Sequence, residues 1–186
     1  PIARINLSEK SFASITRGVG SEERITLAGF YTVECRDAEG RIKWSDTIKN
    51  LVTTVGKNLA LDTILGNSAA GAVVMGLCGT GTKAAGDTQG SHAGWSELGL
   101  ANAPVYTGNR PTPAFSAASS ASKVTSSAVS FAFTSGGTVA GCFINLGGSA
   151  TKDNTTGTLY SAGNFSGGDK VVSNGDSLAV TYTATA

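Results

Sequence analysis

The stretch RITLAGFYTVECRDAEGRIKWSDTIK, residues 24–49, decides the fold class of this chain. Its first half alternates apolar with polar residues, the two-residue period of a strand with one buried face. Asp37-Ala38-Glu39-Gly40 follows as a turn, because Asp begins type I turns and Gly accepts a positive φ at their end. Alternation then resumes in RIKWSDTIK, so the stretch predicts a β-hairpin. The residues predicted to face the core are Ile25, Leu27, Tyr31, Val33, Cys35, Ile42, Trp44 and Ile48.

A helix is predicted directly after the hairpin, over residues 51–65, with Asn50 as the candidate N-cap and Gly66 as the stop. At 100° per residue its apolar side chains fall within about half the circumference, enough to pack on a sheet. Gly56 inside this segment costs up to about 1 kcal/mol of helix propensity. The helix is therefore expected to depend on that packing. The apolar side chains are Leu51, Val52, Val55, Leu59, Leu61 and Leu65.

The chain beyond Gly66 reads as short strands separated by Gly-rich turns. The predicted strands are AVVMGLCG (72–79), ASKVTSSAVSFAF (121–133), TVAGCFINL (138–146), TGTLYSAGNF (156–165) and DSLAVTYTATA (176–186). Many short strands with one helix predict a mainly β domain over residues 24–186, either a β-sandwich or a jelly-roll-like fold. Residues 1–23 show no sustained period and are predicted to form an extended N-terminal arm.

Composition limits the classes of function. At 186 residues the chain fits one domain, and only 15% of its residues are charged, against about 25% in an average protein. The net charge of +1 gives no basic excess for binding nucleic acid. No apolar run reaches the roughly 18 residues of a membrane helix, and the start, PIARINLSEKSF, lacks the apolar core of a signal peptide. We expect a protein made in the cytoplasm that binds neither nucleic acid nor membrane.

The sequence offers no recognisable cofactor or metal site. Cys35, Cys78 and Cys142 are far apart and odd in number, which favours reduced, buried thiols over a disulfide framework. Zinc sites need close Cys or His pairs, and none occurs. The Gly-rich stretch GTGTKAAG (79–86) fails the phosphate-loop pattern, because Lys83 is followed by Ala84 instead of Ser or Thr.

The stretch AGDTQGSHAGWSEL, residues 85–98, contains the only histidine, His92, and one of the two tryptophans, Trp95. The G-x-S-x-G elbow of a serine hydrolase is absent, and carboxylates that could pair for glycoside hydrolysis are few. No enzyme is predicted, and His92 is interpreted as a turn residue. Trp95 is either an anchor for this loop or, together with Tyr106, an aromatic surface on which a sugar could stack. Both interpretations stay open.

Three separated stretches resemble a family of small virion proteins of tailed bacteriophages. Residues 31–65 resemble the family's opening, which runs aromatic–x–V–x–C–x–D–x–x–G, a Trp, N-L-V-T–x–x–G–x–N and an apolar helix. Residues 85–98 resemble its middle loop, A-G-D-T–x–x–S-H-A-G-W–x-E, and residues 156–186 its C-terminal strands. The resemblance covers roughly residues 30–186 and implies a structural protein of the virion.

Within that family the physical properties favour a capsid decoration or cement protein on the head surface. The weakly charged β domain would sit on the shell, and the arm would order against the major capsid protein or a neighbouring copy. A lattice site has rotational symmetry, so a homodimer or homotrimer is expected. The alternatives are a tail- or head-fibre adhesin module that binds host glycans through exposed aromatics near Trp95 and Tyr106, and an envelope hydrolase. The arm residues expected to contact the partner are Ile2, Arg4, Ile5, Leu7, Phe12, Ile15 and Arg17.

Overall fold

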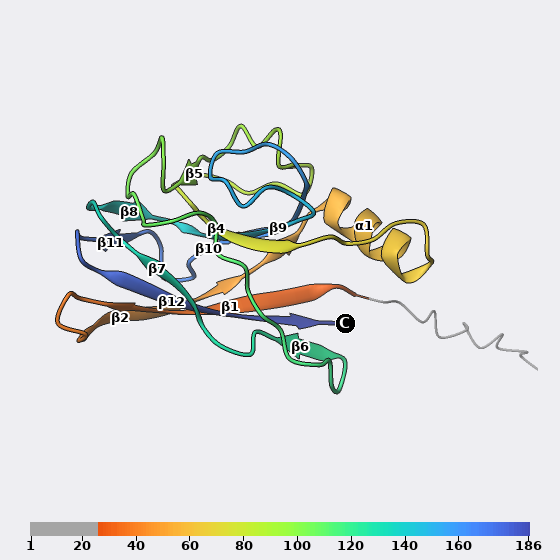
Figure 1. Cartoon of the computed structure of the whole chain (residues 1–186), viewed down its shortest axis with the longest axis horizontal. Coiled ribbons are helices and arrows are strands. Elements are labelled where there is room, and N and C mark those ends of the chain that lie inside the picture. Colours follow the sequence, from red (N-terminus) through yellow and green to blue (C-terminus); the bar gives the residue numbers. More distant parts are fainter. Residues whose placement is uncertain (1–25) are drawn as a thin grey trace, which may run out of the picture.

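A computed structural model describes residues 26–186 as a mainly β domain with two sheets packed face to face and one helix at one end (Figure 1). The predicted fold class, a β-sandwich-like domain with a single helix, is confirmed for this part of the chain. The predicted arm, residues 1–23, and the arm residues expected to contact a partner lie outside the described residues.

The first sheet contains the predicted hairpin. Its strands follow the order β2-β1-β12-β6, β7 also pairs with β12, and every pairing is antiparallel. The hairpin turn has the expected chemistry: Gly40 has φ +81°, and its amide donates to the Asp37 carbonyl over 3.0 Å. The strands are β1 (Ala28–Arg36), β2 (Ile42–Lys49), β6 (Ser122–Val124), β7 (Val129–Ala132) and β12 (Ser177–Thr185).

The second sheet follows the order β3-β10-β9-β4-β5, and a separate ribbon pairs β11 with β8. The five predicted strand segments beyond Gly66 all contain strands, and the second and third each divide into two. The strands are β3 (Leu51–Val52), β4 (Val73–Cys78), β5 (Glu97–Leu98), β8 (Gly137–Val139), β9 (Gly141–Leu146), β10 (Thr158–Asn164) and β11 (Lys170–Val172).

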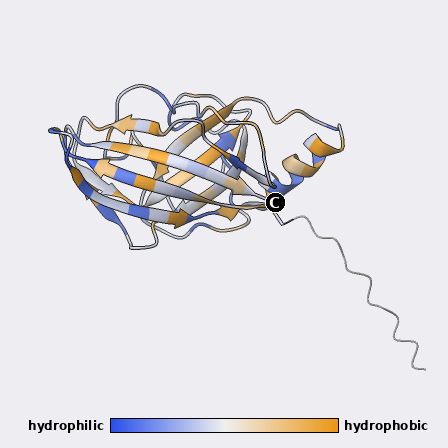
Figure 2. Ribbon diagram, turned by 90° about the horizontal axis from the view of Figure 1, so that it is seen from below, coloured by the Kyte–Doolittle hydropathy of each residue, from blue (hydrophilic) through white to orange (hydrophobic). Residues whose placement is uncertain are grey.

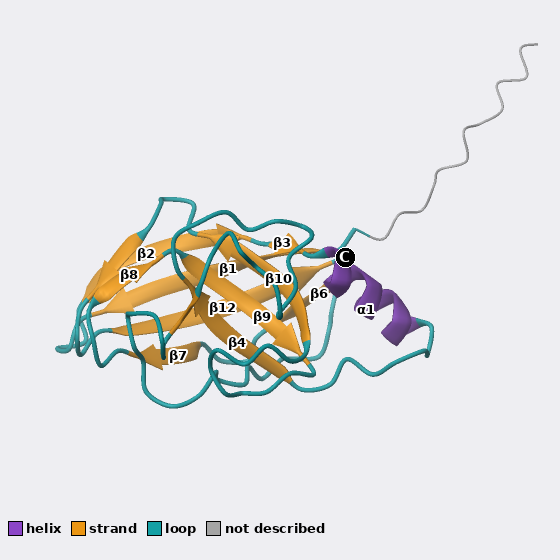
Figure 3. Ribbon diagram, turned by 90° about the horizontal axis from the view of Figure 1, so that it is seen from above, coloured by secondary structure: helices purple, strands orange, loops and turns teal. Residues whose placement is uncertain are grey.

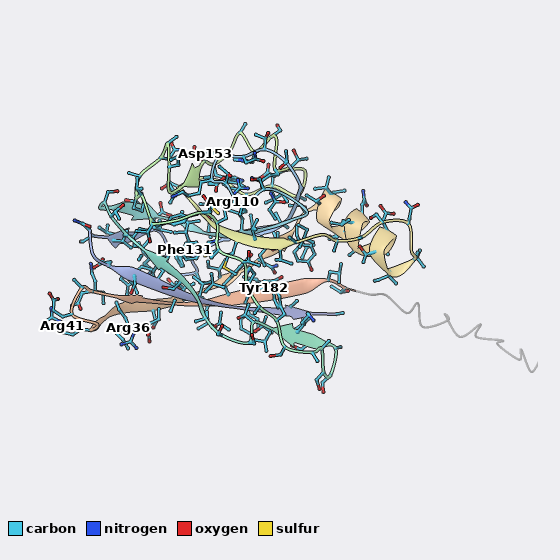
Figure 4. All side chains as sticks on the ribbon, in the orientation of Figure 1. Arg36, Arg41, Arg110, Phe131, Asp153 and Tyr182 are labelled. Carbon is cyan, nitrogen blue, oxygen red and sulfur yellow. The ribbon has the colours of Figure 1, made fainter. Side chains whose placement is uncertain are left out.

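The core lies between the two sheets, where Figure 4 shows Phe131 and Tyr182. Alternate residues of β1 and β12 point inward, as the period-2 pattern predicts: Tyr31 and Val33 of β1 and Val180 of β12 are fully buried. A smaller cluster behind the second sheet joins Trp95 to Phe143 of β9.

Ile42 was predicted to face the core, and this prediction is wrong, because 56% of it is exposed. The register of the hairpin shifts at Cys35/Arg36, so Cys35 pairs with Trp44 while Arg36 pairs with Ile42. A β-bulge of this kind places two residues opposite one, and it moves the residues beyond it to the other face of the sheet. Ile42 therefore lies opposite the outward-facing Arg36.

The helix begins later than predicted. Helix α1 spans Thr54–Ile64, and Thr53, not Asn50, is its N-cap, accepting a hydrogen bond from the Gly56 amide over 3.0 Å. Leu51 and Val52 instead form β3, which pairs with β10. The predicted stop is correct: Leu65 is the C-cap, and Gly66 follows with φ +78°.

The expected packing of an apolar helix face on a sheet is only partly correct: α1 lies against β10 and its Val55 and Leu59 are half-buried, but Leu61 and Leu65 are exposed. Gly56 is the only buried residue of α1, and a Cβ at this position would meet the Tyr160 backbone of β10 at 2.8–2.9 Å or closer. The rest of the helix projects from the end of the sandwich (Figure 3). Leu61, Ile64 and the C-cap Leu65 are 52%, 64% and 80% exposed.

The three cysteines are free and buried, as predicted. Burial raises the pKa of the Cys35 thiol to about 11 and that of Cys78 to about 12, and it raises the pKa of Cys142 well above its usual value. Because the thiolate is the reactive form, we expect a thiol reagent at mildly alkaline pH to label none of the three in the native protein and all three in denaturant. Rapid labelling of one thiol in the native protein would contradict this packing.

Candidate functional site

The loop of residues 85–98, which we call the His92 loop, is held together by the aromatic rings of His92 and Trp95. The imidazole of His92 stacks on the indole of Trp95, with ring centroids 4.0 Å apart and planes inclined by 19°. His92 Nδ1 lies 3.0 Å from the Trp95 carbonyl oxygen, which can only accept, so Nδ1 donates. Trp95 Nε1 donates to Asp87 Oδ2 over 2.8 Å. Trp95 is buried against Phe143, which is the geometry of a loop anchor.

Asp87 and His92 do not form a catalytic pair in this arrangement. The carboxylate of Asp87 accepts from the Trp95 indole and from the Ala84 amide, whereas the hydrogen bond of His92 goes to a backbone carbonyl. Activation of a serine by histidine requires the third group to orient the imidazole. His92 is oriented by Trp95 instead.

Tyr106 does not join this loop. It is buried in the main core, where its ring meets Phe131 edge-on at 5.0 Å. Lys152 Nζ lies 4.3 Å from the Tyr106 ring centroid and donates to the Tyr106 carbonyl over 2.7 Å. Burial raises the pKa of Tyr106 and lowers that of Lys152. The structure therefore does not bring Tyr106 and Trp95 together as an exposed aromatic surface.

A buried ion pair between Arg110 and Glu97 lies behind the His92 loop, and the sequence analysis did not predict it. Arg110 donates to Glu97 through Nε (2.7 Å) and a terminal guanidinium nitrogen (2.5 Å), and both side chains are excluded from solvent. Arg110 also donates to the carbonyls of Ser149 (3.0 Å) and Asn154 (2.8 Å), and Glu97 accepts from the Asp153 amide (3.0 Å). One feature of the sequence could have drawn attention to Arg110: basic residues are rare in this region, and Arg110 is one of five Lys or Arg residues after residue 62.

Glu97 of this pair lines an open polar hollow of about 490 Å³ between the His92 loop and the loop of residues 153–155, and Arg110 lies behind it. Figure 4 places Arg110 beneath the loop that carries Asp153. Within residues 26–186 no Lys or Arg side chain lines this hollow, and no group of three or more His, Cys, Asp or Glu could hold a metal ion. Its polar wall includes Gln89, His92, Glu97, Asn102, Asp153 and Asn154.

A second surface is apolar and lies at the end of the domain that carries α1. A groove of about 270 Å³ runs between the helix and the two residues that precede β1, Thr26 and Leu27, and a shallower hollow of about 220 Å³ is also lined by Leu27. Figure 2 shows apolar residues on the projecting part of α1. We call this surface the apolar end. Its residues are those that line the groove, Thr26, Leu27, Lys57, Ala60, Leu61 and Ile64, together with the exposed C-cap residue Leu65.

Comparison of the chain with protein-family models, with curated proteins and with solved structures gives no match. In residues 26–186 there is no helix of the length and apolarity that crossing a membrane requires.

Proposed function

We propose that this chain is a non-enzymatic decoration protein of a bacteriophage head, which binds the assembled shell and stabilises it. The family resemblance of residues 31–65, 85–98 and 156–186 supports virion membership. The low charge supports a protein that works by contact and not by attracting an ionic ligand. Binding that occurs only on the assembled shell stabilises that shell by mass action.

The observation that carries the proposal is the apolar end. Leu61, Ile64 and Leu65 are each more than half exposed and lie within two turns of one helix. Burying a Leu or Ile side chain fully contributes about 1.5–3 kcal/mol. A protein partner that covers these three residues would therefore gain several kcal/mol, and clustered exposed aliphatic side chains are typical of interaction surfaces.

The apolar end also lies where residues 1–25 join the described domain, because Thr26 and Leu27 line its groove. The arm and the helix can therefore act on the same partner, the major capsid protein. Two linked contacts raise the overall affinity through effective concentration. A homodimer or homotrimer on a symmetric site of the shell remains part of this proposal.

The apolar end is tested with the double variant Leu61→Asp/Ile64→Asp. Charges at these positions oppose burial, so we expect cosedimentation with capsids that lack this protein to weaken by at least about tenfold, equivalent to about 1.4 kcal/mol. Both residues are exposed, so the melting temperature should stay nearly unchanged.

The matched control is Val171→Asp, an exposed apolar residue of β11 at the opposite end of the domain (Figure 1). It should leave capsid binding intact. Equal binding by the double variant and the native protein would exclude the apolar end as the contact with the shell.

Deletion of residues 1–17 tests the arm separately. We expect a folded β domain, with an unchanged circular dichroism spectrum in the β region, that no longer cosediments with capsids. Undiminished binding by this deletion would contradict the role proposed for the arm.

A further inference from the structure

We propose that the polar hollow beside His92 binds a neutral carbohydrate, with room for at least one sugar unit. This site is separate from the apolar end and does not depend on the capsid role, because none of its lining residues belongs to α1 or to β1. The argument rests on the rigidity of its walls, on their charge and on the groups they present.

The walls are preformed. Glu97 and Arg110 join the two loops from below through a bidentate pair, and the Asp153 amide closes the network onto Glu97. Asn102 Nδ2 donates to the Glu97 carbonyl over 2.9 Å and fixes the third side of the hollow. A ligand entering such a frame does not have to order the loops, which removes part of the entropic cost of binding.

The charge of the walls selects a neutral ligand. The carboxylate of Asp153 lies at the exposed rim, and the two oxygens of Glu97 are already occupied by Arg110. Since no Lys or Arg side chain of the described residues lines the hollow, a phosphate or a carboxylate would meet like charge without a compensating cation. In the part of the chain that the structure describes, no group of three or more His, Cys, Asp or Glu side chains is placed to hold a metal ion.

The groups on the walls match hydroxyls, which both donate and accept. Asn102, Asn154, Ser91 and Thr155 line the hollow with carboxamides and hydroxyls. Because His92 Nδ1 donates to the Trp95 carbonyl, Nε2 is the acceptor of the neutral ring. Trp95 covers one face of the imidazole of His92. The C–H surface of a sugar can pack against the opposite face, which is turned away from the indole.

The hydrogen bonds that fix the walls leave one buried acceptor, on Gln89, without a partner. Gln89 is 2% exposed, and its Nε2 donates to the Asn154 carbonyl over 3.3 Å, yet its Oε1 has no hydrogen-bond partner within residues 26–186. A buried acceptor without a donor costs about 1–3 kcal/mol. Because Oε1 is itself enclosed, the Gln89 carboxamide must turn toward the hollow that it lines before a ligand hydroxyl supplies the missing donor.

The test is saturation-transfer NMR on the full chain with glucose, galactose, mannose and N-acetylglucosamine as neutral probes and glucuronate as the anionic probe. We expect at least one neutral sugar to receive saturation and glucuronate to receive none. His92→Ala should reduce the transfer at least about fivefold, and Gln89→Leu should do the same if its melting temperature is preserved. The control Ser130→Ala, on the exposed face of β7, should have no effect.

Three results would overturn the proposal: no transfer to any neutral sugar, equal transfer to glucuronate, or transfer that His92→Ala does not change. A separate arm distinguishes a free sugar from a cell-surface glycan, since only the latter gives binding to host cells that the neutral sugar inhibits. His92→Ala should leave capsid cosedimentation unchanged, so failure of this site and failure of the capsid role give different results.

Discussion

Replacement of Arg110 by alanine is expected to lower the free energy of unfolding by about 3–5 kcal/mol, because it leaves the Glu97 carboxylate buried without its partner. The same change also removes the donors to the Ser149 and Asn154 carbonyls. Chemical denaturation with urea, followed by fluorescence or circular dichroism, measures the change.

Arg36→Ala is the matched control, since it removes an exposed arginine from a pair with Glu34. Exposed pairs contribute about 0–1 kcal/mol, so the control should change stability little. The double variant Glu97→Gln/Arg110→Met, which removes both charges, should recover part of the loss. A change within 1 kcal/mol for Arg110→Ala would contradict the buried, bidentate pair.

Replacement of Gly56 by alanine is expected to destabilise the protein by about 1–3 kcal/mol, the usual cost of overpacking. Helix propensity predicts the opposite sign, because alanine is about 1 kcal/mol better than glycine inside a helix. The structure decides between them: an added Cβ would overlap the Tyr160 backbone, so α1 must move off β10. Thermal and urea denaturation measure the sign.

Asn58→Ala, at an exposed position of the same helix, is the control and should raise stability slightly through propensity alone. Because Gly56 anchors the helix that carries the apolar end, Gly56→Ala should also weaken capsid binding. Stabilisation by Gly56→Ala would show that α1 is not seated on β10 as described.

Features of the fold that depend on neighbouring residues could be predicted from the sequence. The hairpin of β1 and β2 follows from alternation and from the Asp37–Gly40 turn, both of which act within a few residues. The predicted strand segment of residues 121–133 shows the same alternation, since Val129, Phe131 and Phe133 are buried and alternate with Ser130 and Ala132. The alternation of apolar and polar residues shows which side chains are buried, so a strand can be predicted without knowing which strand pairs with it.

Features that depend on distant partners could not be predicted. Leu51 and Val52 fit a helical pattern but pair with β10, more than 100 residues later. Gly56 counted as a cost to the helix, although it is the point of closest approach to Tyr160. Ile42 faces outward because of a β-bulge in the hairpin, and no local sequence pattern predicts that bulge.

The candidate site divides in the same way. The sequence identified the loop of His92 and Trp95 from its rare residues, and the stacking of the two rings is local. The hollow beside them is lined by Asp153 and Asn154 of a distant loop, which Arg110 holds from behind, so it could be recognised only in the folded chain. Tyr106 was grouped with Trp95 for its residue type, but the fold places it in another cluster.

The most direct test of the proposed function is cosedimentation of the purified full chain with expanded capsids that lack it, alongside binding to host cells. We expect saturable binding at many copies per capsid and increased resistance of the loaded capsids to heat. Absence of capsid binding, together with binding to host cells, would contradict the decoration role and would assign the protein to adhesion.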